Sequence, residues 1–303
     1  MAHATTTLTV PAPTPGAAFP RVLRSFGLLR ESGVGMLGAG IVLFWVAVAL
    51  FAPLISPFAP NATLMPFQKP GAAFAGNASV PPGTFWLGTD HLGRDILSRL
   101  IWGSRTVLTY APLATLCAYI VGSIMGLAAG YLRGWVDDVL SRVADIILSF
   151  PVLVLYIIII ATFGASPINI IFAITFASGP GIMRIVRGLT LDLRSREYVA
   201  AAETRGDSSW RIMLVEILPN ARGPIIVDAC VRLGYVTITI GVLGFLGLGL
   251  PPPTPDWGGM INEARSMAMS FPHMTIFPCI AISSLILGFN LLADGLREIS
   301  LRD

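Results

Sequence analysis

Stretches of about 20 apolar residues recur along this chain, and that is the length an α-helix needs to cross the hydrocarbon core of a membrane. Because backbone groups in lipid must be hydrogen-bonded within the protein, the recurrence favours a helical bundle. Of the 303 residues 54% are hydrophobic and 12% are charged, against roughly a quarter charged in a soluble domain. The sequence therefore predicts an all-α integral membrane protein with six transmembrane helices, at about 35–55, 107–132, 146–163, 168–185, 225–250 and 274–292.

The segments between these stretches divide the chain into three parts. Residues 1–32 contain an Ala-, Thr- and Pro-rich start without the pattern of a secretory signal, and we expect a disordered cytoplasmic tail. Residues 33–104 hold the first span and a long external loop, whose last part, 90–102, has apolar residues at helical spacing. We expect an interfacial helix there, leading into a five-span core at 105–303. Interior prolines such as Pro151 are expected to be tolerated.

The distribution of basic residues predicts the orientation, because cytoplasmic segments carry an excess of Lys and Arg. Fourteen arginines fall on one side of the predicted spans, whereas four arginines and Lys69 fall on the other. Both termini are therefore expected in the cytoplasm of a prokaryote, as a multi-pass protein of the inner membrane. No Lys/Arg run of the kind that holds nucleic acid is present. The cytoplasmic set is Arg21, Arg24, Arg30, Arg133, Arg142, Arg184, Arg187, Arg194, Arg196, Arg205, Arg211, Arg222, Arg297 and Arg302.

Catalytic and metal-binding patterns are absent from the sequence. The three cysteines lie in apolar stretches without a Cys-x-x-Cys pair, and His3, His91 and His273 make no metal constellation, so no metal site is predicted. A phosphate-binding Walker loop needs a Gly-Lys-Ser/Thr sequence, but the single lysine, Lys69, precedes Pro70. This chain is therefore not expected to be an ATPase or another enzyme.

Residues 195–220 form the most informative cytoplasmic segment. Its first half is rich in alanine, Gly206 offers the left-handed conformation that ends a helix, and Asp207 or Ser208 can cap the next one. Pro219 is expected to stop that second helix just before the fifth span. The pattern predicts an elbow of two short helices, suited to a groove on a soluble partner.

The spacing Ala201-Ala202-x-x-x-Gly206, followed by Leu218-Pro219, resembles the coupling-loop signature of binding-protein-dependent ABC importer permeases. The resemblance implies that a loop at about 188–222 docks on the ATP-binding subunit, with Glu197 and Asp207 in the same contact. The leading Glu of that signature is Ala200 here, and Glu216 stands where an apolar residue or histidine is usual.

Two further segments resemble the peptide and nickel branch of these permeases, specifically the second permease of the pair. They are Leu87-Gly-Thr-Asp90-His-Leu-Gly-Arg-Asp95-Ile-Leu-Ser-Arg99 and Phe289-Asn290-Leu-Leu-Ala-Asp294-Gly295-Leu-Arg297. The usual Asp-Pro-Arg ending reads Ser300-Leu-Arg302. The resemblance implies peptide import by alternating access, with nickel or another small solute as the alternative substrate.

The resemblance also implies a set of partners. They are a second, homologous permease, two cytoplasmic subunits that bind ATP and Mg, and an extracytoplasmic substrate-binding protein, all beside membrane lipid. This chain itself is expected to bind no cofactor. A stand-alone secondary transporter and a membrane-embedded enzyme are the competing classes, but the third, fourth and sixth spans are nearly free of ionisable groups.

Two groups of charged residues have open roles. Asp228 and Arg232 lie four apart in the fifth span, and they form either a pathway or gate pair or an intrahelical pair reaching the interface. Asp90, Arg94 and Asp95 either cap and solvate the interfacial helix or contact the substrate-binding protein.

Overall fold

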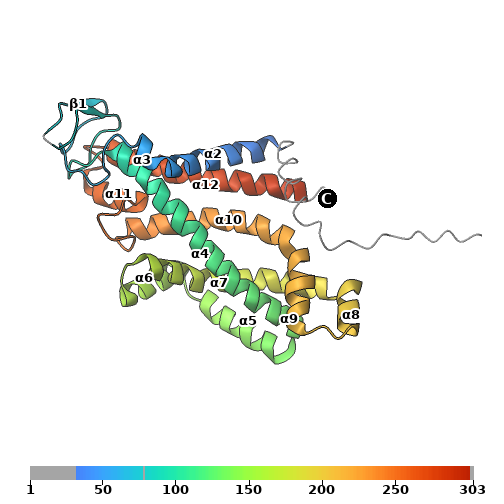
Figure 1. Ribbon diagram of the computed structural model, residues 1–303. Helices are drawn as coiled ribbons and strands as arrows, with labels where there is room; N and C mark the ends of the chain where they lie inside the picture. Colours follow the sequence, from blue (N-terminus) through green and yellow to red (C-terminus); the bar gives the residue numbers. More distant parts are fainter. Residues whose placement is uncertain (1–31, 78, 301–303) are drawn as a thin grey trace, which may run out of the picture.

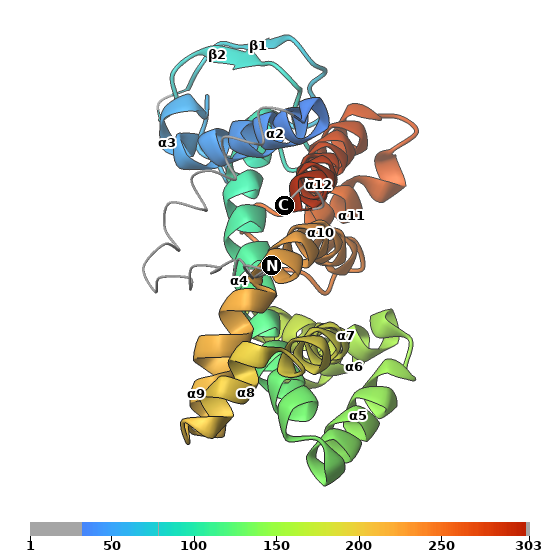
Figure 2. The same ribbon diagram turned by 90° about the vertical axis from the view of Figure 1, so that its right-hand side faces the viewer.

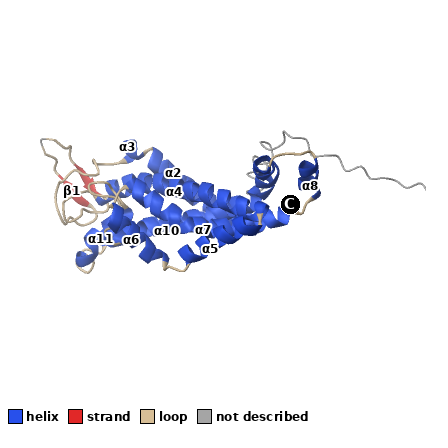
Figure 3. Ribbon diagram, turned by 90° about the horizontal axis from the view of Figure 1, so that it is seen from below, coloured by secondary structure: helices blue, strands red, loops and turns tan. Residues whose placement is uncertain are grey.

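The computed structural model describes residues 32–77 and 79–300, which are mostly helical. The expected disordered tail, apart from Ser32, lies outside the described residues. Figure 1 shows long helices running between two ends of the molecule, with β1 at one end, and Figure 3 places α8 at the other. The helices are α2 (Gly33–Leu50), α3 (Ala52–Ile55), α4 (Ile96–Leu132), α5 (Gly134–Leu148), α6 (Val152–Phe163), α7 (Pro167–Arg194), α8 (Glu197–Thr204), α9 (Ser209–Arg211), α10 (Leu218–Phe245), α11 (Trp257–Ala264) and α12 (His273–Ser300), with the π-helix η2 (Ile212–Ile217) and the 3-10 turn η3 (Arg265–Met267).

Five stretches of helix are long and apolar enough to cross a membrane, and a bent pair, α5 with α6, makes a sixth if it is one span. This confirms a mostly helical membrane protein with five or six candidate spans, one of them near the N-terminus. The five are Gly33–Leu50, Ile96–Leu132, Pro167–Arg194, Ser209–Phe245 and His273–Glu298.

The span expected at 146–163, with Pro151 inside it, is not one uninterrupted helix. The chain forms α5 and α6 instead, bent by 88° at a short break that contains Ser149 and Pro151. Pro151 has no N–H to donate, and its ring would clash with the carbonyl of residue 147 if the helix continued. Pro151 instead occupies the N-cap position of α6, so the apolar stretch is divided between two helices.

The separate interfacial helix expected at 90–102 is also absent from the described residues. Residues 90–95 form turns, and Asp95 caps the start of α4 by accepting a 2.8 Å hydrogen bond from the Ser98 N–H. The apolar residues from Ile96 to Ile101 are the first turns of a single 37-residue helix that includes the second span. The helix continues past Trp102 as far as Leu132, although Pro112 inside it removes one backbone hydrogen bond.

Helices α4 and α7 pack through glycines that repeat every fourth residue of α4. A Cβ atom added to Gly122, Gly126 or Gly130 would lie 2.7–2.9 Å from a backbone carbonyl oxygen of α7. Small residues at this spacing allow the two backbones to approach closely, which is how many membrane helices associate. The contacted residues advance along α7 as those of α4 do, so the two helices run parallel.

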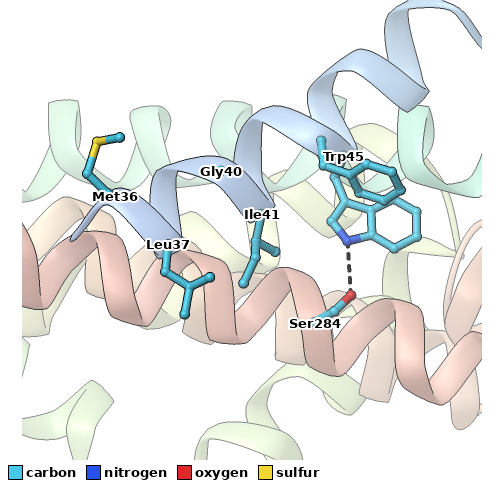
Figure 4. Close-up of a pocket in the computed structure, with 7 residues that line it drawn as sticks. Met36, Leu37, Gly40, Ile41, Trp45 and Ser284 are labelled. Carbon is cyan, nitrogen blue, oxygen red and sulfur yellow. Dashed lines mark hydrogen bonds between the residues drawn. The ribbon is translucent and has the colours of Figure 1, made fainter. Parts of the chain in front are cut away.

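Helix α2 packs along α12, and both lie above α10 in Figure 1. Gly38 of α2 faces the backbone of Leu292, and Gly295 of α12 faces Gly35. Beside this contact lies an open apolar groove of about 400 Å³, where the Trp45 Nε1–H donates a 2.9 Å hydrogen bond to Ser284 Oγ (Figure 4). The groove is lined by Met36, Leu37, Gly40, Ile41, Phe44, Trp45 and Ser284.

The long loop after α3 is folded rather than extended. Strands β1 (Ala72–Phe74) and β2 (Gly83–Phe85) pair antiparallel, and Figure 2 shows them above α2 and α3. The rings of Phe58, Phe74 and Phe85 pack with centroids 5.4–6.1 Å apart, which gives the loop its own small core.

Candidate functional site

The first half of the predicted elbow is α8, and it ends in a left-handed glycine as expected. Gly206 has φ +78°, its N–H donates to the Glu203 carbonyl (3.0 Å), and the Asp207 N–H donates to the Ala202 carbonyl (3.2 Å). This pair of bonds is the Schellman motif, which satisfies the last carbonyls of a helix. No atom lies within 4 Å of a Cβ built at Gly206, so conformation rather than space requires glycine there.

The second half of the elbow begins at Ser208, whose hydroxyl accepts a 3.4 Å hydrogen bond from the Arg211 N–H. The expectation that Pro219 stops this helix is wrong, because the helix continues from Ser209 to Phe245. The π-helical segment η2 ends with the Leu218 N–H bonded to the Met213 carbonyl. Pro219 has no N–H to donate, so one backbone hydrogen bond is missing where η2 passes into α10, but the helix continues through it. The second half of the elbow and the fifth span are therefore one continuous helix.

One face of the elbow packs into the bundle and the other is exposed. Ala202 is fully buried, whereas Glu197, Ala201, Gly206 and Pro219 are exposed. Asp207 and Leu218 are half-buried. The elbow thus has one face packed against the bundle and one exposed face. The core around Ala202 consists of Val199, Ile212, Met213 and Ile217, with Leu127, Ile182 and Val186 from the neighbouring spans.

Ion pairs join the two halves of the elbow. Arg205 donates to Asp207 (2.9 Å) and to Glu216 (3.3 Å), so the unusual acid at 216 has a partner across the turn. Exposed pairs of this kind contribute little stability, typically below about 1 kcal/mol. Burial raises the pKa of Tyr198 in α8, which keeps its hydroxyl neutral.

Sequence reasoning missed the residues that attach α8 to the spans. Tyr131, at the end of α4, donates a 3.0 Å hydrogen bond to Glu203, and the Arg194 guanidinium lies 5.1 Å from the centre of the Tyr131 ring. These three side chains come from α4, α7 and α8, and no local pattern in the sequence joins them.

Asp228 and Arg232 do form a pair, with 2.7 Å between Arg232 Nε and Asp228 Oδ2. The Tyr119 hydroxyl on α4 also donates to Asp228 Oδ2. The terminal nitrogens of Arg232 lie 3.6 Å from the position of a Cβ at Gly181 on α7. The pair therefore lies where α4, α7 and α10 meet, and its side chains contact residues of the other two helices as well as each other.

The charged residues expected near the external face are buried in this chain. Arg94 pairs with Asp90 (2.5 Å) and with Glu263 of α11, while Arg99 Nε lies 4.0 Å from Asp90. Asp95 is fully buried as the cap of α4, and that burial raises its pKa. Capping and loop anchoring account for these contacts, and a contact of Asp90, Arg94 and Asp95 with a substrate-binding protein stays a prediction.

The same cluster brings together Asp90, His91 and Glu263, whose ligand atoms lie within 4.8 Å of one another. Arg94 already pairs with both carboxylates, so a cation there would face a competing guanidinium. Nearby, burial raises the pKa of Asp256, the N-cap of α11, to about 6. This cluster fits a structural anchor better than a metal centre.

At one end of the bundle, the fifth span is thus continuous with the second half of the helical elbow. Residues 118–303 match the family described as binding-protein-dependent transport system inner membrane component, and the chain belongs to this family. Residues 26–79 match the N-terminal transmembrane domain of oligopeptide transport permease C.

Similar curated proteins are permeases of the same kind. The glutathione transport system permease protein GsiD of Pectobacterium atrosepticum is 42% identical over 72% of this chain and 72% of its own length. The dipeptide transport system permease protein DppC of Alkalihalophilus pseudofirmus is 36% identical over 90% of this chain and 87% of its own. GsiD of Escherichia coli is 37% identical over 89% and 86%.

Family membership fixes several properties of the chain. It is the multi-pass inner membrane permease of its transport system, not the ATPase, and such a system includes a binding protein and an ATPase. It is of the permease C type, the second permease of a peptide system, as the sequence predicted.

Proposed function

We propose that this chain forms one half of a channel that imports short peptides into the cytoplasm, driven by ATP. Support comes from the relatives, which are named for dipeptide and glutathione transport, because both solutes are short peptides. The predicted termini on the cytoplasmic side would place the elbow on that side too. ATP and Mg would be bound by the partner ATPase subunits.

In the proposed mechanism, the continuous helix that joins the second half of the elbow to the fifth span transmits movement from the ATPase to the span. Closure of two ATPase subunits would push on the exposed face of α8, whose buried face packs against η2. Since η2 and α10 have no break between them, that displacement would be passed directly to the span. A second, similar permease would complete the pathway, and rocking of the spans would alternate access.

The substrate class is tested in proteoliposomes that contain the complete complex and its binding protein. We expect ATP-dependent uptake of a labelled dipeptide, reduced by unlabelled dipeptide or glutathione but not by Ni²⁺. Uptake of Ni²⁺ without peptide transport would favour the nickel alternative. Uptake without ATP, driven by an ion gradient, would indicate a secondary transporter.

We further propose that Asp228 and Arg232 act as a gate or pathway pair rather than as an intrahelical pair alone. Their contacts with Tyr119 and Gly181 support this role, because they link α10 to α4 and α7 within the membrane. A movement of α10 would have to break or slide these contacts. Ionisable groups in a span are costly and are usually retained for such a function.

Replacing Arg232 with glutamine is expected to lower uptake about fivefold to tenfold, because Asp228 would lose its partner in the bundle. The matched control is the charge exchange Asp228→Arg with Arg232→Asp, which keeps an i,i+4 pair but moves the guanidinium away from Gly181. We expect the exchange not to restore uptake. Restoration by the exchange would assign the pair a purely intrahelical role.

A further inference from the structure

The polar side chains of α10 within the membrane lie mostly on one side of the helix. Asp228, Arg232, Tyr235 and Thr239 follow one another at spacings of four, three and four residues. At 3.6 residues per turn, these positions fall within an arc of about 60°, which we call the polar face of α10. Thr237 lies on the opposite side, where it is buried and donates to a backbone carbonyl of its own helix.

The side of α10 opposite the polar face packs against the rest of this chain. A Cβ atom added to Gly234 would lie 3.1 Å from the Asn290 side chain of α12, and one added to Gly241 would lie 3.3 Å from Ile282. Viewed from the end of the bundle in Figure 2, α10 lies between α12 and α7. The polar face is therefore turned away from α12.

The polar face is only partly covered by this chain. Toward the elbow, Asp228 accepts a hydrogen bond from Tyr119 of α4, and Arg232 reaches Gly181 of α7. One turn further along, Tyr235 is 65% exposed, and its hydroxyl has no hydrogen-bond partner among the described residues. Neighbouring helices therefore cover the polar face at Arg232 and leave it open at Tyr235.

Tyr235 lies too deep to belong to the membrane interface. It stands ten residues before Phe245, the last residue of α10, which corresponds to about 15 Å of helix. The hydrocarbon core is about 30 Å thick, so this side chain is near its middle. Tyrosines that face lipid gather at the interfaces, where the hydroxyl meets water. A hydroxyl and a neighbouring guanidinium at mid-span need polar surroundings, which lipid does not supply.

We infer that the polar face of α10 is one wall of the solute pathway, and that a peptide in transit bonds to the Arg232 guanidinium and the Tyr235 hydroxyl. The inference rests on the proposed function, since it needs a peptide pathway that a second permease completes. A short peptide carries a carboxylate, an ammonium group and peptide bonds. The polar face offers a guanidinium, a carboxylate and two hydroxyls along about 16 Å of helix.

The pairing of Arg232 leaves room for such a ligand. It bonds Asp228 through Nε, so its two terminal nitrogens remain as donors of the kind that bind a carboxylate. A permanent contact between the polar face and the second permease is the competing arrangement. In that arrangement Tyr235 would be dry, whereas in a pathway it is reached by water.

The test measures water access to a thiol at position 235, in lipid nanodiscs that hold the complete complex and leave both membrane faces open to reagent. The three native cysteines, Cys117, Cys230 and Cys279, are first replaced by alanine. Tyr235→Cys is then compared with Leu287→Cys, a position 51% exposed in the middle of α12. The probe, 2-sulfonatoethyl methanethiosulfonate, is an anion excluded from lipid that reacts with thiolates, so its rate reports water access.

We expect the Tyr235→Cys thiol to react at least tenfold faster than the Leu287→Cys thiol. Modified Tyr235→Cys complexes in proteoliposomes should also lose peptide uptake, because the added sulfonate would stand in the pathway. Thr239→Cys provides a smaller change on the same face, and its thiol should also react faster than that at position 287.

Equal, slow reaction of all three thiols would overturn the inference, because the polar face would then be covered by protein or lipid. Fast modification that leaves uptake unchanged would also overturn it, since the wetted face would not be the route. Peptide uptake by the cysteine-free parent is measured separately. An active parent with unreactive thiols at 235 and 239 would reject this wall while leaving peptide import intact.

Discussion

Cells that carry Gly206→Val are expected to lose at least nine-tenths of their ATP-driven peptide uptake. Gly206 adopts φ +78°, and a β-branched residue held in that region costs about 1–3 kcal/mol. Relief of that strain would open the Schellman turn and turn α8 away from η2. Since a Cβ at this position meets no atom within 4 Å, the effect would come from backbone conformation and not from a clash.

Gly206→Asn is the matched control, because asparagine tolerates the left-handed region far better than valine. We expect this variant to keep uptake within about twofold of the wild type. Immunoblots of the membrane fraction and co-purification of the ATPase would show that both variants are inserted and assembled. Equal uptake by the valine and asparagine variants would show that the turn at Gly206 has no part in coupling.

Gly126→Leu is expected to prevent stable assembly of the bundle. A Cβ at Gly126 would lie 2.7 Å from the Met183 carbonyl oxygen and 3.0 Å from the Arg187 N, both of them backbone atoms that cannot rotate away. The helices α4 and α7 would have to separate along their contact. Overpacking of this kind costs about 1–3 kcal/mol, and more where backbone must move. Thermal unfolding of the detergent-purified complex measures the effect.

Gly40→Leu provides the control for adding a leucine to a membrane helix. A Cβ at Gly40 meets nothing within 4 Å, so this variant should melt within a few degrees of the wild type. Gly126→Leu should either melt at least 10 °C lower or fail to purify as a complex. Similar melting of the two variants would mean that the close approach of α4 and α7 is not what holds the bundle.

The positions of the spans could be predicted from the sequence because hydropathy and length are local properties. The effect of each proline on its helix could not be predicted in the same way. Pro112, Pro180 and Pro278 lie inside continuous helices, whereas Pro151 separates two helices. Whether a proline breaks a span depends on which carbonyl loses its donor and on what packs beside it. Neither quantity can be read from a single segment.

The elbow was predictable to the extent that its signals are short-range. The alanine-rich helix, the left-handed Gly206 and the cap at Ser208 each depend on a few neighbouring residues. Its attachment was not predictable, since Tyr131 and Glu203 are 72 residues apart. The same holds outside the membrane, where Arg94 meets Glu263 across 169 residues. Long-range polar contacts become visible only once the helices have been placed.

The central claim is that the elbow passes the work of ATP hydrolysis to the fifth span. Its most direct test is the number of peptides taken up for each ATP hydrolysed, measured in the same proteoliposomes with the complete complex and binding protein. We predict that Gly206→Asn keeps the wild-type number of peptides taken up per ATP. Gly206→Val should still hydrolyse ATP, but it should take up at least tenfold fewer peptides per ATP. An unchanged ratio in Gly206→Val, whatever its absolute rate, would contradict it.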